Sequence, residues 1–362
     1  MGNLLGGSFS DTSSTPGAPP QLIVACISGG YDNYIKIYDE LVKDQTDSSN
    51  PDSSNPLTKL DSQGNSVLHA LFSSQSPSAE ILEHIHSTLA PATLSKMYAQ
   101  KSVVLGCNPI WICVAYGNLE MLKLVTSKLD ELDDSNQTIQ SLINVPNLQG
   151  DTALLATCSR GNLPMLQHLS TLLPPSTFTS LLTTPNKNGT TPLLTILSNS
   201  HPDLLTYLVS LPSVPLPLST PTSSGLYPLH IASERGNLPI LTSVLESVGL
   251  PGWSCLDKNG ATPLHVSSFI GNLEVCRVLV EYVGSNVRLL KLKDSQNRTP
   301  YLIAMLKGHD ELGDLLSAAG AGEINESERK EIMEAKERRE EGKRKREEER
   351  RKIKGAEVEE IQ

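Results

Sequence analysis

The sequence predicts an all-α protein, built as an array of stacked helix-turn-helix units with short hairpin loops and followed by a charged C-terminal helix. Three observations support this prediction. A turn-and-helix motif recurs every 35 to 44 residues, glycine follows each clear copy at a fixed offset, and the composition changes to dense mixed charge from Glu323 on. Repeats of this length are typical of arrays in which each unit buries its apolar face against its neighbours.

The repeat consists of two motifs that stay in phase along the chain. The tripeptide Gly-Asn-Leu occurs four times, and nine residues before each of its glycines a second motif begins, which reads Thr-Pro-Leu-His in its clearest copy at 262–265. The seven starts of the second motif are Ser66, Asn108, Thr152, Thr191, Tyr227, Thr262 and Thr299. A period of this kind predicts one repeat array rather than two globular domains.

Each part of the unit has a physical role, which the copy at Thr262 illustrates. Asx and Gly residues such as Asp257 and Gly260 favour a tight hairpin turn. Thr262 caps a short first helix, and the proline after it loses no hydrogen bond at the first helical position. Gly271 ends that helix, and Asn272 begins an antiparallel second helix whose apolar residues pack on the next unit.

The turn, the Thr-Pro-Leu-His motif and Gly-Asn-Leu, recurring in this order, resemble the ankyrin-repeat family, whose unit is about 33 residues long. The resemblance implies an ankyrin-repeat solenoid of about seven repeats plus an N-terminal half repeat, from Leu22 to Leu41. We accordingly divide the chain into a flexible N-terminus (1–19), an ankyrin-repeat domain (20–320) and a charged helical tail (321–362). Because the units exceed the family length, we expect lengthened loops or second helices.

Particular residues at motif positions have expected consequences. In the last unit Asn297 replaces the turn glycine, and asparagine is the residue that next tolerates a positive φ. The resemblance implies that His69, His230 and His265, at the fourth position of the motif, make structural hydrogen bonds. Trp111 stands at the same position, and we expect it to fill the core.

The charge and cysteine patterns exclude several classes of function. The chain has 362 residues and a formal net charge of −10, which disfavours nucleic acid and anionic membranes as partners. Six scattered cysteines without a CxxC pair predict neither a disulfide framework nor a metal site. The common catalytic and nucleotide-binding motifs are missing, so we expect no enzyme and no cofactor. Proline and glycine interrupt both long uncharged runs, 102–119 and 204–233, so we expect no transmembrane span.

The two ends of the chain leave alternatives for localisation open. The first residues carry neither the basic nor the apolar part of a secretory signal, so we expect a cytoplasmic protein. Gly2 leaves N-myristoylation open as a lipid anchor, although Gly6 stands where the acylation pattern has Ser or Thr. The basic cluster 343–346 is either a nuclear-import signal or part of a solvated helix that opposite charges at i,i+4 stabilise.

The resemblance also implies where a partner binds, because ankyrin-like arrays present hairpin tips and the ends of first helices on a concave face. Mapped onto this sequence, the candidate protein-binding residues are Tyr116, Arg160, Glu234, Arg235, Lys258, Asn259, Phe269, Ile270, Arg298 and Lys307. Tyr116, Phe269 and Ile270 are aromatic or apolar, which is typical of interface anchors. Alternatively, these three side chains pack on a neighbouring hairpin tip.

The charge distribution indicates a class of partner. Residues 323–362 carry 14 acidic and 13 basic side chains, so residues 1–322 hold −9 of the net charge. We therefore expect a non-enzymatic interaction module or scaffold whose acidic concave face binds a basic protein. The alternatives are an assembly chaperone for a proteasomal or ribosomal subunit, a membrane-tethered adaptor that uses Gly2, and a regulatory subunit of a separate enzyme.

Overall fold

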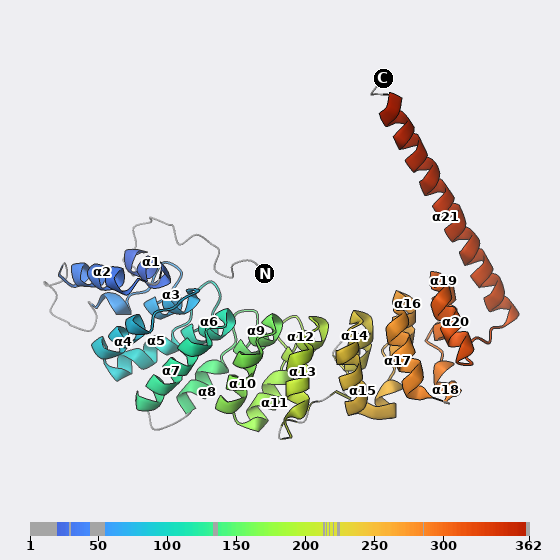
Figure 1. Cartoon of the computed structure of the whole chain (residues 1–362). Coiled ribbons are helices and arrows are strands. Elements are labelled where there is room, and N and C mark those ends of the chain that lie inside the picture. Colours follow the sequence, from blue (N-terminus) through green and yellow to red (C-terminus); the bar gives the residue numbers. More distant parts are fainter. Residues whose placement is uncertain are drawn as a thin grey trace. The chain divides into compact units, whose positions relative to one another are not determined.

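The computed structural model describes residues 20–28, 30–43, 55–132, 137–212, 214, 216, 218–219, 221–222, 225–284 and 286–359. Every regular element within these ranges is a helix, so the predicted all-α fold class is confirmed (Figure 1). The chain divides between residues 215 and 216 into two compact units, which we call the N-terminal unit and the C-terminal unit. Gly2 lies outside the described residues.

The N-terminal unit is a stack of helical hairpins. Its pairs of first and second helices are α1 (Pro20–Ser28) and α2 (Tyr31–Lys43), α3 (Val67–Ser73) and α4 (Ala79–Thr88), α6 (Pro109–Tyr116) and α7 (Leu119–Leu132), α9 (Ala153–Arg160) and α10 (Leu163–Leu172), and α12 (Pro192–Ser198) and α13 (Pro202–Ser210). Each first helix packs on the next first helix, and the short 3-10 helix η1 (Pro56–Thr58) packs on α2. Because α1 and α2 pack on each other, the predicted half repeat forms a helical pair.

The C-terminal unit continues the same pattern and then changes it. Its pairs are α14 (Pro228–Arg235) and α15 (Leu238–Trp253), α16 (Pro263–Ile270) and α17 (Leu273–Val283), and α19 (Pro300–Lys307) and α20 (Asp310–Ala318). The first helices α14, α16 and α19 stack in this order, as do the second helices α15, α17 and α20. The last element is the long helix α21 (Glu326–Glu359), which the charge pattern of the tail predicts.

Short third helices account for most of the extra length of the repeats. They are α5 (Pro91–Ala99), α8 (Gln137–Ile143), α11 (Pro175–Thr183) and α18 (Val287–Leu290). Proline opens α5 and α11, and their apolar side chains, such as Tyr98 and Phe178, are buried. We expected lengthened loops or second helices. A separate helix forms instead because an insertion that carries apolar residues can bury them only by folding back onto the repeat.

The hairpin turns share one arrangement and are joined to each other. The Oδ1 atom of Asp257 accepts hydrogen bonds from the backbone N–H groups of Asn259 and Ala261, both at 2.8 Å. The Ser295 N–H of the next turn donates to the Asn259 carbonyl at 2.8 Å. Asn297 has a φ of 62°, so the prediction that it replaces a turn glycine is confirmed. The corresponding turn-to-turn bonds of the N-terminal unit run from Val103 to Gln63, from Leu148 to Leu105 and from Lys187 to Gln149.

Where the fourth residue of the motif is His or Trp, it ties its repeat to the next one. His265 Nε2 lies 3.1 Å from the carbonyl oxygen of Arg298 in the next turn. His69 and His230 reach the next turn in the same way, at 3.2 and 2.8 Å. The predicted structural role of the histidines is therefore confirmed. Trp111 is buried as expected, and in addition its indole N–H donates to the next turn at 2.8 Å.

The tail helix is solvated along most of its described length, but its beginning packs on the last repeat. Two of the predicted i,i+4 ion pairs are present, from Glu334 to Arg338 at 4.0 Å and from Glu341 to Lys345 at 2.7 Å. We expected this helix to bury no face. Instead, α21 contacts α19, and only 8% of the Ile332 side chain surface is exposed.

Candidate protein-binding face

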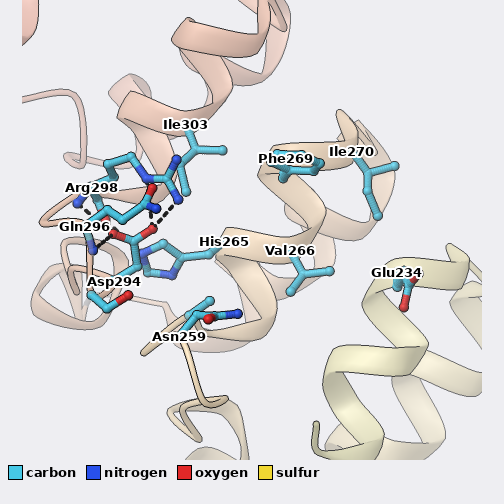
Figure 2. A pocket seen from close by; sticks show the side chains of 12 residues that line it. Glu234, Asn259, His265, Val266, Phe269, Ile270, Asp294, Gln296, Arg298 and Ile303 are labelled. Carbon is cyan, nitrogen blue, oxygen red and sulfur yellow. Dashed lines mark hydrogen bonds and ion pairs between the residues drawn. The ribbon is translucent and has the colours of Figure 1, made fainter. Parts of the chain in front are cut away.

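A groove lies on the first helices and hairpin turns of the C-terminal unit (Figure 2). It has a volume of 440 Å³ and is formed by the end of α14, by α16, by Ile303 of α19 and by the turns before α16 and α19. Of the ten candidate residues, five line it: Glu234, Asn259, Phe269, Ile270 and Arg298. The structure therefore brings half of the predicted set together in one place.

The apolar part of the groove is formed by the last turn of α16. Phe269 is 50% exposed and Ile270 is 44% exposed. They stay outside the packing between repeats because α16 ends directly after them, at Gly271, whose φ of 87° only glycine adopts at little cost. Lys307 covers one face of the Phe269 ring, with its Nζ 3.9 Å from the ring centre. Phe269 and Ile270 nevertheless remain accessible to a partner.

An ion pair stiffens the opposite wall of the groove. Arg298 donates from Nε and Nη2 to Oδ2 of Asp294, at 2.9 and 2.7 Å. Burial raises the pKa of Asp294, but the hydrogen bonds and charge of Arg298 outweigh it, so the pKa lies below its ordinary value. Arg298 is therefore a fixed side chain whose charge is largely compensated. Figure 2 shows this pair, with Gln296, across the groove from Glu234 of α14.

His265 lines the base of the groove without the properties of a catalytic group. Its side chain is buried, and both ring nitrogens have backbone partners, since Nδ1 accepts from Thr262 N–H at 3.1 Å. Burial lowers its pKa, and the carbonyl of Arg298 raises it less, so the ring is neutral at neutral pH. Because both ring nitrogens are hydrogen-bonded to the backbone, this imidazole is a structural group rather than a general base.

Three further candidate residues surround the groove without lining it. Arg235 is exposed beside Glu234 at the end of α14, and exposed Lys307 lies over Phe269. Lys258 is exposed on the hairpin tip, and its side chain extends over the preceding turn, where a Cβ on Gly225 would collide with it.

The remaining two candidates lie in the N-terminal unit and contact each other. The guanidinium carbon of Arg160 stands 5.5 Å from the centre of the Tyr116 ring. Tyr116 is half-buried, and its ring contacts Arg160, which lies at the end of the next first helix rather than on a hairpin tip.

The groove also contains residues that the sequence-based mapping missed. Val266 and Ile303 line it, and both occupy the position directly after the fourth motif residue. Val266 is partly exposed and Ile303 is buried, so the apolar character of this position was the available signal. In the N-terminal unit, Val103, Val104 and Leu148 lie at hairpin turns and are 72%, 58% and 49% exposed. The candidate residues on hairpin tips were chosen among polar side chains, so these three apolar tip residues were not included.

The carboxylates do not lie on the face where we expected them. In the C-terminal unit, the second helices α15, α17 and α20 carry six exposed acids and one base, namely Glu246, Glu274, Glu281, Asp310, Glu311, Asp314 and Arg277. The first helices α14, α16 and α19 carry one acid, Glu234, and two bases, Arg235 and Lys307. The expected acidic concave face is thus not confirmed for this unit, because its first helices carry one acid against two bases.

Several other kinds of site are missing from the described part of the chain. Its His, Cys, Asp and Glu side chains form no group that could hold a metal ion. None of its helices has both the length and the apolar character needed to cross a membrane. Burial raises the pKa of the Cys26 thiol to about 12 and that of Cys276 to about 11, which makes both thiols unreactive.

These features define the class of protein as a helical-repeat array with an accessible groove on its first helices. A comparison with protein families matches ankyrin repeats, in three copies, to residues 229–327. That range begins in α14 and includes every residue of the groove. A search of curated proteins found no match to the chain. Residues 229–327 are therefore ankyrin repeats, as the resemblance implies.

Proposed function

We propose that the protein is a non-enzymatic interaction module and that the groove of the C-terminal unit binds an apolar side chain of a protein partner. The observation that supports this proposal is the exposure of Phe269 and Ile270 inside a 440 Å³ groove. Large apolar side chains exposed next to each other are costly in water unless a partner covers them. Ankyrin repeats indicate protein-protein interaction.

The groove has the composition of an interface hot spot. Its centre is apolar, with Phe269, Ile270 and Val266, and its rim is polar, with Asn259 and Glu234. Covering the exposed half of one Phe side chain would contribute about 1 kcal/mol. An anchor of this kind gains more when a polar rim excludes water around it. The Arg298–Asp294 pair holds its wall in place before binding, which lowers the ordering cost.

The first prediction concerns Phe269. In affinity purification of the full-length protein with quantitative mass spectrometry, Phe269→Asp should lose at least one partner about tenfold or more, because it places a carboxylate at the apolar centre. Leu256→Asp is the matched control, since Leu256 is 49% exposed against 50% for Phe269 but lies outside the groove. A photo-crosslinking residue at Ile270 should label the same partner directly.

Two results would contradict this proposal. One is an identical set of partners for Phe269→Asp and Leu256→Asp, when both variants unfold at the wild-type temperature. The other is a crosslink from position 270 only to this chain itself. The identity of a recovered partner distinguishes the remaining alternatives. A proteasomal or ribosomal subunit would indicate an assembly chaperone. An enzyme whose activity co-purifies would indicate a regulatory subunit, and other proteins would indicate a scaffold.

A second candidate is a basic partner that binds the second helices of the C-terminal unit. The six exposed carboxylates of α15, α17 and α20 favour it, since only Arg277 opposes them there. In the same purification, such a partner should be lost at high salt and in the double variant Asp310→Lys, Asp314→Lys, and it should survive Phe269→Asp. If every recovered partner still binds at high salt and binds the Asp310→Lys, Asp314→Lys variant, the second helices are not a binding face for a basic partner.

A further inference from the structure

The beginning of α21 packs on the last repeat through one stripe of side chains. Glu328, Ile332, Ala335 and Arg339 are spaced by four, three and four residues, so they share a helix face. Each is covered at least in part, and Ile332 is 8% exposed, whereas its neighbour Met333 on another face is 60% exposed. The helix contacts α19 along this stripe.

Arg339 makes the most specific contact of the stripe. Its Nη2 donates to the carbonyl oxygen of Met305, in the last turn of α19, at 3.1 Å. Its guanidinium lies over Gly308, where a Cβ would collide with it. The Met305 carbonyl also accepts from the Gly308 N–H at 3.2 Å, and a cation at this end of a helix is favoured by the helix dipole. The contact therefore closes the C-terminal end of α19.

The same kind of joint connects one repeat to the next elsewhere in the chain. A side chain at the start of a second helix reaches a carbonyl near the end of the preceding first helix. Three such contacts join Asn118 Nδ2 to Phe72 O at 2.9 Å, His201 Nε2 to Ser159 O at 3.4 Å and His309 Nε2 to Phe269 O at 3.4 Å. At Gly161 and Gly271, the glycine that ends the first helix lies under His201 and His309, as Gly308 lies under Arg339.

We propose that residues 326–339 of α21 form the C-terminal cap of the repeat array, with Arg339 in the place that the Asn or His of a following repeat would occupy. Among the described residues, α21 is the helix that follows α20. A single polar helix supplies it instead and covers the apolar end of the stack with Ile332. Terminal units with a polar outer face are what a repeat array needs to remain soluble.

Further contacts hold the start of the cap. The side-chain Oδ1 of Asn325 accepts from the Glu328 N–H at 2.8 Å, and the Asn325 N–H donates to Glu328 Oε2 at 2.9 Å. This reciprocal pair fixes where the helix begins. Lys293 also lies 3.8 Å from Glu328. This ion pair is long, and its lysine is exposed, so it contributes little and Ile332 and Arg339 should dominate the stability of the cap.

The cap and the groove share helix α19. Ile303 lines the groove, Lys307 lies over Phe269, and Met305 between them accepts the hydrogen bond from Arg339. A loose cap should therefore loosen one wall of the groove. This inference does not rest on the proposed function, because the state of the cap can be measured without any partner.

The test is hydrogen–deuterium exchange on the full-length protein. Arg339→Ala should raise amide exchange in α19 and in residues 326–339 about tenfold, since it removes a charge-assisted hydrogen bond, and it should leave α14 unchanged. Arg338→Ala is the matched control, because Arg338 is exposed and pairs only with Glu334. Equal exchange in α19 for the two variants would overturn the proposal.

If Arg339→Ala misfolds, amide exchange will also be faster in α14. A second pair of variants tests the cap independently of that outcome. Ile332→Ala removes the buried apolar contact, and Met333→Ala removes a side chain of similar size from an exposed position. The cap predicts faster exchange in α19 for the Ile332 variant alone. If neither variant changes α19, or if both change it equally, residues 326–339 are not a cap.

Discussion

The fourth residue of the repeat motif shows how one position can keep its function while its chemistry changes. His265 and Trp111 differ in size and in their ability to bind protons, yet each donates a ring N–H to the next hairpin turn. The sequence predicted the histidine bonds through the family resemblance. It could not predict the tryptophan bond, because an indole in an apolar run is expected in the core, and any nearby carbonyl can accept a hydrogen bond from its N–H.

Because the buried histidines can bind a proton, the free energy of unfolding should depend on pH. Burial lowers the pKa of His69 from 6.5 to about 4. Between these values the unfolded chain binds a proton that the folded chain excludes, so stability is complete above the unfolded pKa and falls as the pH drops towards the folded one. The largest loss from His69 is about 3 kcal/mol. Burial also lowers the pKa of His230 and His265, which adds to the loss in the same direction.

Urea unfolding followed by tryptophan fluorescence, at about pH 7.5 and about pH 5, measures this loss. His69→Gln is the informative variant, since its amide can donate to the same carbonyl and does not titrate. We expect it to reduce the difference between the two pH values. An unchanged difference would show that His69 is not responsible.

At the scale of the element, the turns and first helices were predictable and the third helices were not. Asx, Gly, Thr and Pro act locally, so their spacing alone predicts where a hairpin turns and where a helix starts. α11 begins with Pro175 inside a polar Thr- and Ser-rich stretch, which reads as a loop. Its helical state depends on burying Phe178 and Leu182 against α9 and α12, and these contacts come from residues outside the segment.

The turn before α19 provides the prediction at this scale. Asn297 has a φ of 62°, a conformation that alanine adopts only at a cost of about 1 kcal/mol. Asn297→Ala should therefore lower the thermal unfolding temperature, and Asn297→Gly should match or exceed the wild type, because glycine occupies this position in the other turns. Gln296→Ala is the control at an exposed neighbouring position. Equal stability of the alanine and glycine variants at 297 would contradict the role of positive φ.

At the scale of the whole molecule, net charge was the least reliable guide to the binding face. The value of −9 for residues 1–322 is correct, but the array separates its charges by face. Acids gather on second helices, and Arg235 and Lys307 stand at the ends of first helices. Only the packing decides which side of a helix faces solvent, so a sum over the sequence could not assign the charge to a surface. Phe269 and Ile270 were predictable, because a helix-ending glycine follows them directly.

The tail carries the prediction about localisation. We propose that residues 343–346 act as a nuclear-import signal, since four consecutive bases stand on a solvent-exposed part of α21. Replacing all four with glutamine in the full-length fluorescent fusion should abolish nuclear accumulation. The control replaces Arg329 and Lys330 of the same helix, which lie outside the cluster. An unchanged distribution in the first variant would leave the cluster with the other role, as part of a solvated helix.

The stripe on α21 also determines where the chain tolerates insertions and deletions. Glu328 and Arg339 are eleven positions apart, close to three helical turns, so both belong to the stripe. One residue added or removed between them would rotate Arg339 by about 100° and move it off Gly308. The same change after Arg339 would alter only the length and direction of the projecting arm. The spacing of residues along α21 is therefore constrained up to residue 339, whereas the length of the helix beyond it can vary.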